Sequence, residues 1–131
     1  MLRSLVAVLV GYLTMMLGVT TFFAFVVFVL LGGHPEDPHA FEPPRWLYVL
    51  ELVTAPVFAG LGGYVCAWIA RRKVMHHALA LVCVVAIAGV VSIVGEAGMK
   101  PMWETIAVVV LGCAGVPLGA RLRLVHERAV A

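Results

Sequence analysis

Charged residues are scarce in this chain. Asp, Glu, Lys and Arg together make up 12% of its 131 residues, where an ordinary soluble domain has about a quarter. Apolar residues make up 63%, and the mean hydropathy is +1.08. These values exclude an ordinary soluble domain and predict a single integral membrane domain, covering residues 1–131, with little mass outside the bilayer.

The chain also lacks the usual motifs of enzyme chemistry. It has no phosphate-binding loop, no zinc-protease helix motif and no nucleophile triad. Its three cysteines, Cys66, Cys83 and Cys113, lie in separate apolar runs without paired spacing. Its five histidines lie in connections, a tail or helix ends, where they could not hold a haem between helices. These are His34, His39, His76, His77 and His126. We therefore expect neither catalysis nor a cofactor.

Long apolar runs are what the sequence does contain. Four of them approach or exceed the roughly 20 residues that a helix needs to cross a bilayer: residues 5–31, 46–70, 75–94 and 102–120. Short polar connections separate them. The sequence thus predicts an all-α bundle of four transmembrane helices that run up-down-up-down.

The basic residues predict how this bundle is oriented. Seven of the nine arginines and lysines fall on one side of a four-span arrangement, and only Arg45 and Lys100 fall on the other; the seven are Arg3, Arg71, Arg72, Lys73, Arg121, Arg123 and Arg128. Because basic residues are retained on the cytoplasmic side, both termini should be cytoplasmic. The location that fits is the bacterial inner membrane. Topology and lipid headgroups account for this charge without nucleic acid.

Two of the predicted spans carry stripes of small residues. Ala55, Ala59, Gly63 and Ala67 follow one another at four-residue spacing in the second span, and Gly115 and Gly119 do so in the fourth. Small side chains let helix backbones approach closely, which is how helices associate where lipid removes the hydrophobic driving force. The stripes predict helix contacts, either inside the chain or with another subunit.

One hairpin resembles a known pattern. "GGYVCAWIARRKVMHHA", residues 62–78, joins a glycine pair, a helix end in Ala-Arg-Arg and a basic turn before His-Ala. It resembles a hairpin of uncharacterised bacterial four-helix membrane proteins. The resemblance covers about 17 residues and implies a cytoplasmic-membrane protein of similar layout, with no activity or ligand attached.

Glu51 is the candidate functional residue within a span. It lies five residues beyond Trp46, about 7.5 Å deeper along a helix. An ionisable group below the membrane interface is a functional candidate by default. It could equally reach toward water or pair with a neighbouring base.

The connection between the first two spans is rich in polar groups and prolines. His34, Glu36, Asp37, His39 and Glu42 include suitable zinc or copper ligands. However, four interspersed prolines hold the backbone extended and direct these side chains apart. We therefore expect this connection to form a rigid, acidic surface in preference to a metal site. That surface would either be merely soluble or dock a partner.

Two functional classes fit these features. The first is a small non-catalytic scaffold or accessory subunit of a larger membrane assembly, whose partners are membrane lipids and other membrane subunits or a second copy of the chain. The alternative is a small oligomeric transporter or channel for a cation, using Glu51 and the outer carboxylates. A dry bundle with Glu51 at the headgroups would favour the scaffold, and a deep charged residue facing a water-filled cavity would favour transport.

The predicted orientation can be tested by thiol labelling. In a variant without its native cysteines, a single cysteine placed within residues 34–42 should react with an impermeant thiol reagent added to intact cells. A cysteine placed next to Lys73 should react only after the cells are opened. The reverse labelling pattern would refute the orientation.

Overall fold

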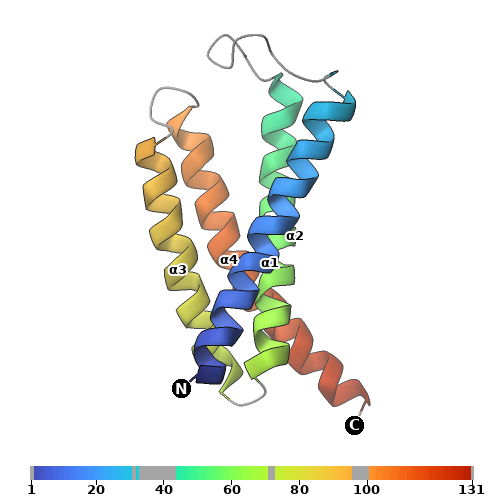
Figure 1. Ribbon diagram of the computed structural model, residues 1–131, viewed down its shortest axis with the longest axis vertical. Helices are drawn as coiled ribbons and strands as arrows, with labels where there is room; N and C mark the ends of the chain where they lie inside the picture. Colours follow the sequence, from blue (N-terminus) through green and yellow to red (C-terminus); the bar gives the residue numbers. More distant parts are fainter. Residues whose placement is uncertain (1, 31, 33–43, 71–72, 96–100, 131) are drawn as a thin grey trace.

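The computed structural model describes residues 2–30, 32, 44–70, 73–95 and 101–130. Nearly all of them lie in α1 (Leu2–Phe25) with its π-helical extension η1 (Val26–Leu30), α2 (Arg45–Ala70), α3 (Val74–Gly95) and α4 (Met102–Val130). Each of the four long helices is long and apolar enough to cross a membrane. The prediction of an all-α protein with four such helices is confirmed. Consecutive helices run in opposite directions, so both termini lie at one end (Figure 1).

The helix α4 extends beyond the apolar run that marks it in the sequence. It continues from the predicted span 102–120 to Val130, because residues 121–130 contain neither glycine nor proline. Within this extension Arg123 Nη2 lies 2.7 Å from Glu127 Oε1, an ion pair one helical turn apart.

The turn between α2 and α3 is built around Lys73. Its backbone has φ 50°, a left-handed conformation that lets the chain reverse in few residues. The Lys73 carbonyl accepts the backbone N–H of His76 at 2.9 Å and lies 3.0 Å from His77 Nδ1. These contacts cap the first turn of α3.

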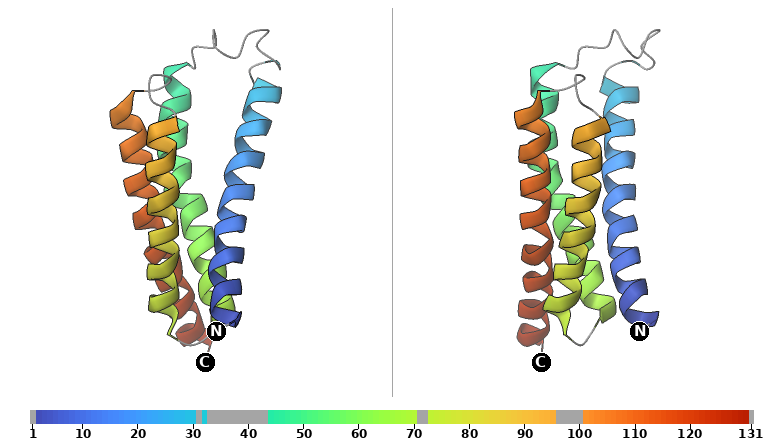
Figure 2. Two further views of the ribbon diagram at one scale, coloured as in Figure 1. Left: turned by 60° about the vertical axis from the view of Figure 1, so that its left-hand side comes forward. Right: turned by 90° about the vertical axis from the view of Figure 1, so that its left-hand side faces the viewer.

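The helices are arranged in a ring whose order is not the order of the chain. α2 packs most extensively against α4 and also packs against α1 and α3, and α3 packs in addition against α4 and α1. Among the described residues α1 and α4 make no contact, and they stand on opposite sides of the bundle with α2 and α3 between them (Figure 2, right). The largest contact therefore joins two helices that run in the same direction.

Small residues make the contact between α2 and α4 possible. A Cβ atom added at Gly63 would meet the carbonyl oxygen of Val116, and one added at Gly119 would meet the carbonyl oxygen of Gly60. At Gly115 an added Cβ would lie 2.5 Å from the carbonyl oxygen of Pro56 and 2.9 Å from the Cβ of Ala59. The two backbones thus touch at positions where any side chain would push them apart. We call this the α2–α4 contact.

A second close backbone approach holds α1 against α2. A Cβ atom at Gly11 would lie 2.9 Å from the carbonyl oxygen of Gly62, and one at Gly62 would lie 2.7 Å from the carbonyl oxygen of Gly11. Seven residues on, Gly18 faces the ring of Phe58. These glycines were not among the predicted packing residues, although their seven-residue spacing in a span without charge is a signal for a helix contact.

The helix α3 contributes a stripe of larger side chains and one glycine. Its buried residues recur at helical spacing and face the other three helices: Val74, Ala78, Leu81, Val85 and Gly89. Leu81 is fully buried, and an added Cβ at Gly89 would lie 2.6 Å from the Val109 side chain of α4. Large apolar side chains cover the outside of the bundle, as a lipid-facing surface requires.

The α2–α4 contact predicts which glycines tolerate a methyl group. Gly63→Ala and Gly119→Ala should each lower the stability of the detergent-solubilised protein by about 1–3 kcal/mol, because the added methyl group meets a backbone carbonyl that cannot rotate away. Gly63→Leu should cost at least as much. Thermal unfolding followed by circular dichroism measures the effect.

The matched control is Gly112→Ala on α4. There an added Cβ would lie 3.8 Å from a Val85 methyl group, an ordinary contact, and alanine favours helix over glycine by up to about 1 kcal/mol. This variant should be as stable as the parent or more so. Equal stability of all three alanine variants would show that the α2–α4 contact is not formed.

Candidate functional site

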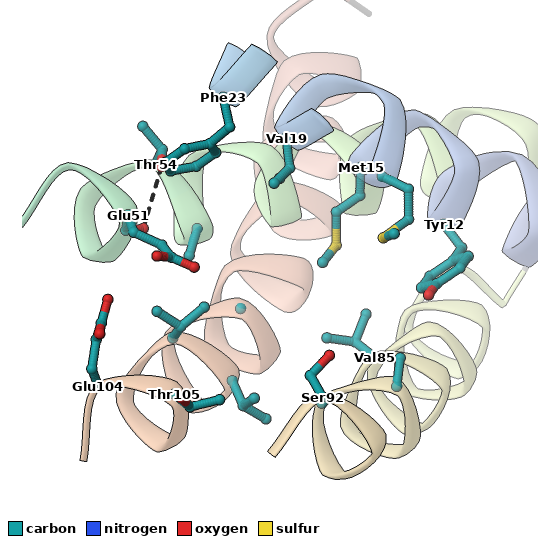
Figure 3. Close-up of a pocket in the computed structure, with 17 residues that line it drawn as sticks. Tyr12, Met15, Val19, Phe23, Glu51, Thr54, Val85, Ser92, Glu104 and Thr105 are labelled. Carbon is teal, nitrogen blue, oxygen red and sulfur yellow. Dashed lines mark hydrogen bonds between the residues drawn. The ribbon is translucent and has the colours of Figure 1, made fainter. Parts of the chain in front are cut away.

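A cavity of about 210 Å³ lies inside the bundle, in the half where α2 and α4 begin. All four helices contribute to its wall (Figure 3). The polar residues that line it are Tyr12, Glu51, Thr54, Ser92, Glu104 and Thr105. We call it the carboxylate cavity, because two of these residues are glutamates.

The two glutamates come from neighbouring parallel helices. Glu51 lies in the second turn of α2 and Glu104 in the first turn of α4. In Figure 3 the Glu104 side chain extends from α4 toward α2, and the Glu51 carboxylate points into the space between the helices. The cavity therefore has both carboxylates at one end.

Glu104 combines a position at a helix N-terminus with complete burial. Its position in the first turn of α4 places it near the positive end of the helix dipole, and its backbone N–H donates to the Pro101 carbonyl at 3.0 Å. Yet Glu104 has no exposed surface, and its carboxylate oxygens are shielded from water. A buried carboxylate requires positive charge or hydrogen-bond donors close by.

Glu51 is partly buried and its helix turn is held locally. The Thr54 hydroxyl donates to the carbonyl oxygen of Leu50 at 2.8 Å, with a weaker contact of 3.3 Å to the carbonyl oxygen of Glu51. This hydroxyl is thus committed to its own helix, as is Thr14, which donates to the Val10 carbonyl at 2.8 Å.

Most of the remaining wall is apolar. α1 contributes Met15, Met16, Val19 and the ring of Phe23. α3 and α4 contribute small and branched side chains, namely Val85, Ala88, Val108 and Val109. Methionine adapts to irregular shapes, and aromatic faces attract cations. The cavity combines two carboxyl groups with walls that favour apolar groups.

The α2–α4 contact closes the end of the cavity that lies toward the middle of the bundle. The lining reaches Ala55 on α2 and Gly112 on α4. One turn further along each helix, Ala59 and Gly115 are already in contact. The cavity therefore ends where the small residues allow the two backbones to touch.

The predicted site residues fall into three groups. Glu51 and Ala55 line the carboxylate cavity. Ala59, Gly63, Gly115 and Gly119 lie in the α2–α4 contact, and Ala67 is buried in the same core. His34, Glu36, Asp37, His39 and Glu42 lie outside the described residues. Within the described ranges, no three His, Cys, Asp or Glu side chains gather to form a metal site.

Glu104 was not predicted as a site residue, although the sequence holds a signal for it. Eleven residues, about three helical turns, separate it from Gly115, so both lie on nearly the same face of α4. Glu51 likewise precedes Ala55 and Ala59 at four-residue spacing on α2. Each carboxylate therefore continues the small-residue face of its helix. Two such faces that pack together bring the carboxylates to one place.

Comparison of the chain with family models, with curated proteins and with solved structures finds no match. The functional argument consequently depends on the geometry of the carboxylate cavity.

Proposed function

We propose that the protein is a membrane transporter for a small organic cation, and that the carboxylate cavity is its binding site. The observation that supports this proposal is that Glu51 and Glu104 lie together at one end of a cavity inside a helix bundle. Ionisable side chains within membrane helices are rare and usually serve a substrate or ion pathway. This favours the cation transporter over the scaffold that the sequence alone suggested first.

The charge of the ligand follows from the cost of burying carboxylates. Glu51 is partly buried and Glu104 fully buried, in a bundle surrounded by lipid. A second negative charge nearby raises this cost, whereas a cation between the two carboxylates lowers it. A ligand with a single positive charge, such as a protonated or quaternary amine, would interact with both.

The chemical class of the ligand follows from the rest of the wall. A metal ion such as calcium takes six to eight oxygen ligands, roughly, whereas most of this wall is carbon and methionine sulfur. Apolar substituents on an amine would contact Met15, Val19 and Val109, and the Phe23 ring is available for a cation–π contact. A volume of about 210 Å³ accommodates a molecule of moderate size, with on the order of ten non-hydrogen atoms.

The proposed orientation places this cavity toward the outside of a bacterial inner membrane. Both termini and Lys73 lie at the opposite end of the bundle (Figure 1), together with Arg121, Arg123 and Arg128. Retention of basic residues in the cytoplasm supports cytoplasmic termini. Release of the cation to the cytoplasm would then require the helices to separate at the α2–α4 contact, as alternating access demands.

The scaffold interpretation has less support from the structure than it had from the sequence alone. It relied on small-residue surfaces that a partner helix could occupy, and Gly63, Gly115 and Gly119 are instead covered within the chain. It still predicts that Glu51→Gln leaves co-purifying proteins unchanged in gentle detergent. It also predicts that reversing the charges of Glu36, Asp37 and Glu42 to lysine releases those proteins, most clearly at low salt.

Binding of benzyltrimethylammonium to the purified protein tests the transporter proposal. Titration calorimetry in detergent should detect binding to the parent, and Glu51→Gln and Glu104→Gln should each weaken it by about tenfold or more, since each removes one attractive charge from an apolar site. In reconstituted vesicles the same substitutions should abolish uptake of the radiolabelled cation.

Two controls separate this site from general charge effects. Glu127→Gln removes a carboxylate at the other end of α4 and should leave binding and uptake unchanged. Neopentylbenzene, an uncharged molecule of the same shape, should bind at least tenfold more weakly than the cation. Binding that is insensitive to both Glu51→Gln and Glu104→Gln would refute the proposal.

A further inference from the structure

A second cavity, of about 280 Å³, lies between α2 and α4 at the end where both helices finish. Its lining is small and mostly polar or aromatic: Tyr64, Val65 and Trp68 from α2, and Arg123 and His126 from α4. We call it the Arg123 cavity. It shares no residue with the carboxylate cavity.

Arg123 is held in a fixed position beside this cavity. Its side chain is only 16% exposed, and its Nη2 lies 2.7 Å from Glu127 Oε1. The guanidinium carbon also lies 5.9 Å from the centre of the Tyr64 ring, within range of a cation–π contact. The guanidinium is therefore oriented before any ligand arrives.

The hydrogen-bonding capacity of Arg123 is only partly used. A guanidinium has five N–H donors, and the ion pair with Glu127 is made through Nη2. The buried Nε has no hydrogen-bond partner among the described residues. A buried donor without an acceptor is unfavourable, so a ligand that brings acceptor oxygens into this cavity would be stabilised there.

We propose that the Arg123 cavity binds the phosphate group of an anionic phospholipid. Arginine matches phosphate oxygens with two parallel N–H donors, and Tyr64, Trp68 and His126 each carry a further donor. The Glu127 carboxylate opposes an incoming anion, but Arg121 and Arg128 lie on the same end of α4 and offset it. Basic pockets between helices at the cytoplasmic side are suited to lipid headgroups.

The surface next to the cavity favours a lipid over free phosphate. Leu61 and Trp68 lie on one face of α2 and are 51% and 56% exposed. Leu118, Leu122 and Val125 recur at helical spacing on α4 and are at least 57% exposed. These side chains form apolar tracks that run from the cavity along the outside of the bundle, where acyl chains would lie. Trp68 itself is typical of the headgroup level.

Native mass spectrometry of the purified protein tests this site. The protein is exchanged into detergent containing equal amounts of phosphatidylglycerol and phosphatidylcholine, and the lipid that stays bound is measured. The parent should retain phosphatidylglycerol selectively, and Arg123→Gln should reduce this retention by about tenfold. Arg123→Lys should give an intermediate result, because it keeps the charge and loses the paired donors.

Matched variants decide between a site and a diffuse charge effect. Arg121→Gln and Arg128→Gln remove the same charge from exposed positions on the same helix end that do not line the cavity, and each should retain clearly more of the lipid than Arg123→Gln. His126→Gln changes an exposed residue that lines the cavity and should weaken retention even if Arg123→Gln does not fold. Equal loss in all variants, or no loss in the cavity variants, would overturn the proposal.

A competition experiment distinguishes a phospholipid from free inorganic phosphate as the source of the bound phosphate group. Inorganic phosphate added in large excess should not displace phosphatidylglycerol, since it offers no acyl chains to the apolar tracks. Complete displacement by inorganic phosphate would overturn the lipid assignment and identify a site for free phosphate. The experiment measures retained lipid alone, so its outcome is independent of cation transport.

Discussion

The structure depends on the contact of two backbones, α2 and α4, at positions that carry no side chain. In a bilayer, lipid is as apolar as the helix surface, so helices associate through close packing and not through burial of apolar area. Gly63 against Val116 and Gly119 against Gly60 bring carbonyl groups of one helix onto Cα atoms of the other. This contact joins parallel helices and thereby sets the ring order α1, α2, α4, α3.

The same two helix faces account for the carboxylate cavity. Along α2 the small residues are preceded by Glu51, and along α4 they are preceded by Glu104, on nearly the same face. Where the side chains are small the backbones touch, and where the glutamates begin the helices leave space between them. A packing device in one half of the bundle thus positions charge in the other half. The closed side of the cavity is also the barrier that transport would have to open.

Charge is distributed unequally between the two ends of the bundle. The carboxylates of the first cavity lie where α2 and α4 begin, and Arg123 lies where they finish. We propose a cation as the ligand at the first end and the phosphate group of a lipid as the ligand at the second. A lipid held in the Arg123 cavity would contact both helices of the α2–α4 contact. The two proposals therefore concern opposite ends of one helix pair, although neither requires the other.

The sequence by itself determined the class and the elements of this protein. Four runs of apolar residues have the length that a helix needs to cross a bilayer, and within a helix every backbone group is hydrogen-bonded inside its own segment. The sequence also indicated which faces of α2 and α4 are small, and it singled out Glu51. Only the tertiary structure decided that these two faces meet each other and that Glu104 joins Glu51. Helical periodicity determines the face on which a residue lies, but the neighbour of that face depends on contacts between residues more than fifty positions apart, such as Gly63 and Val116.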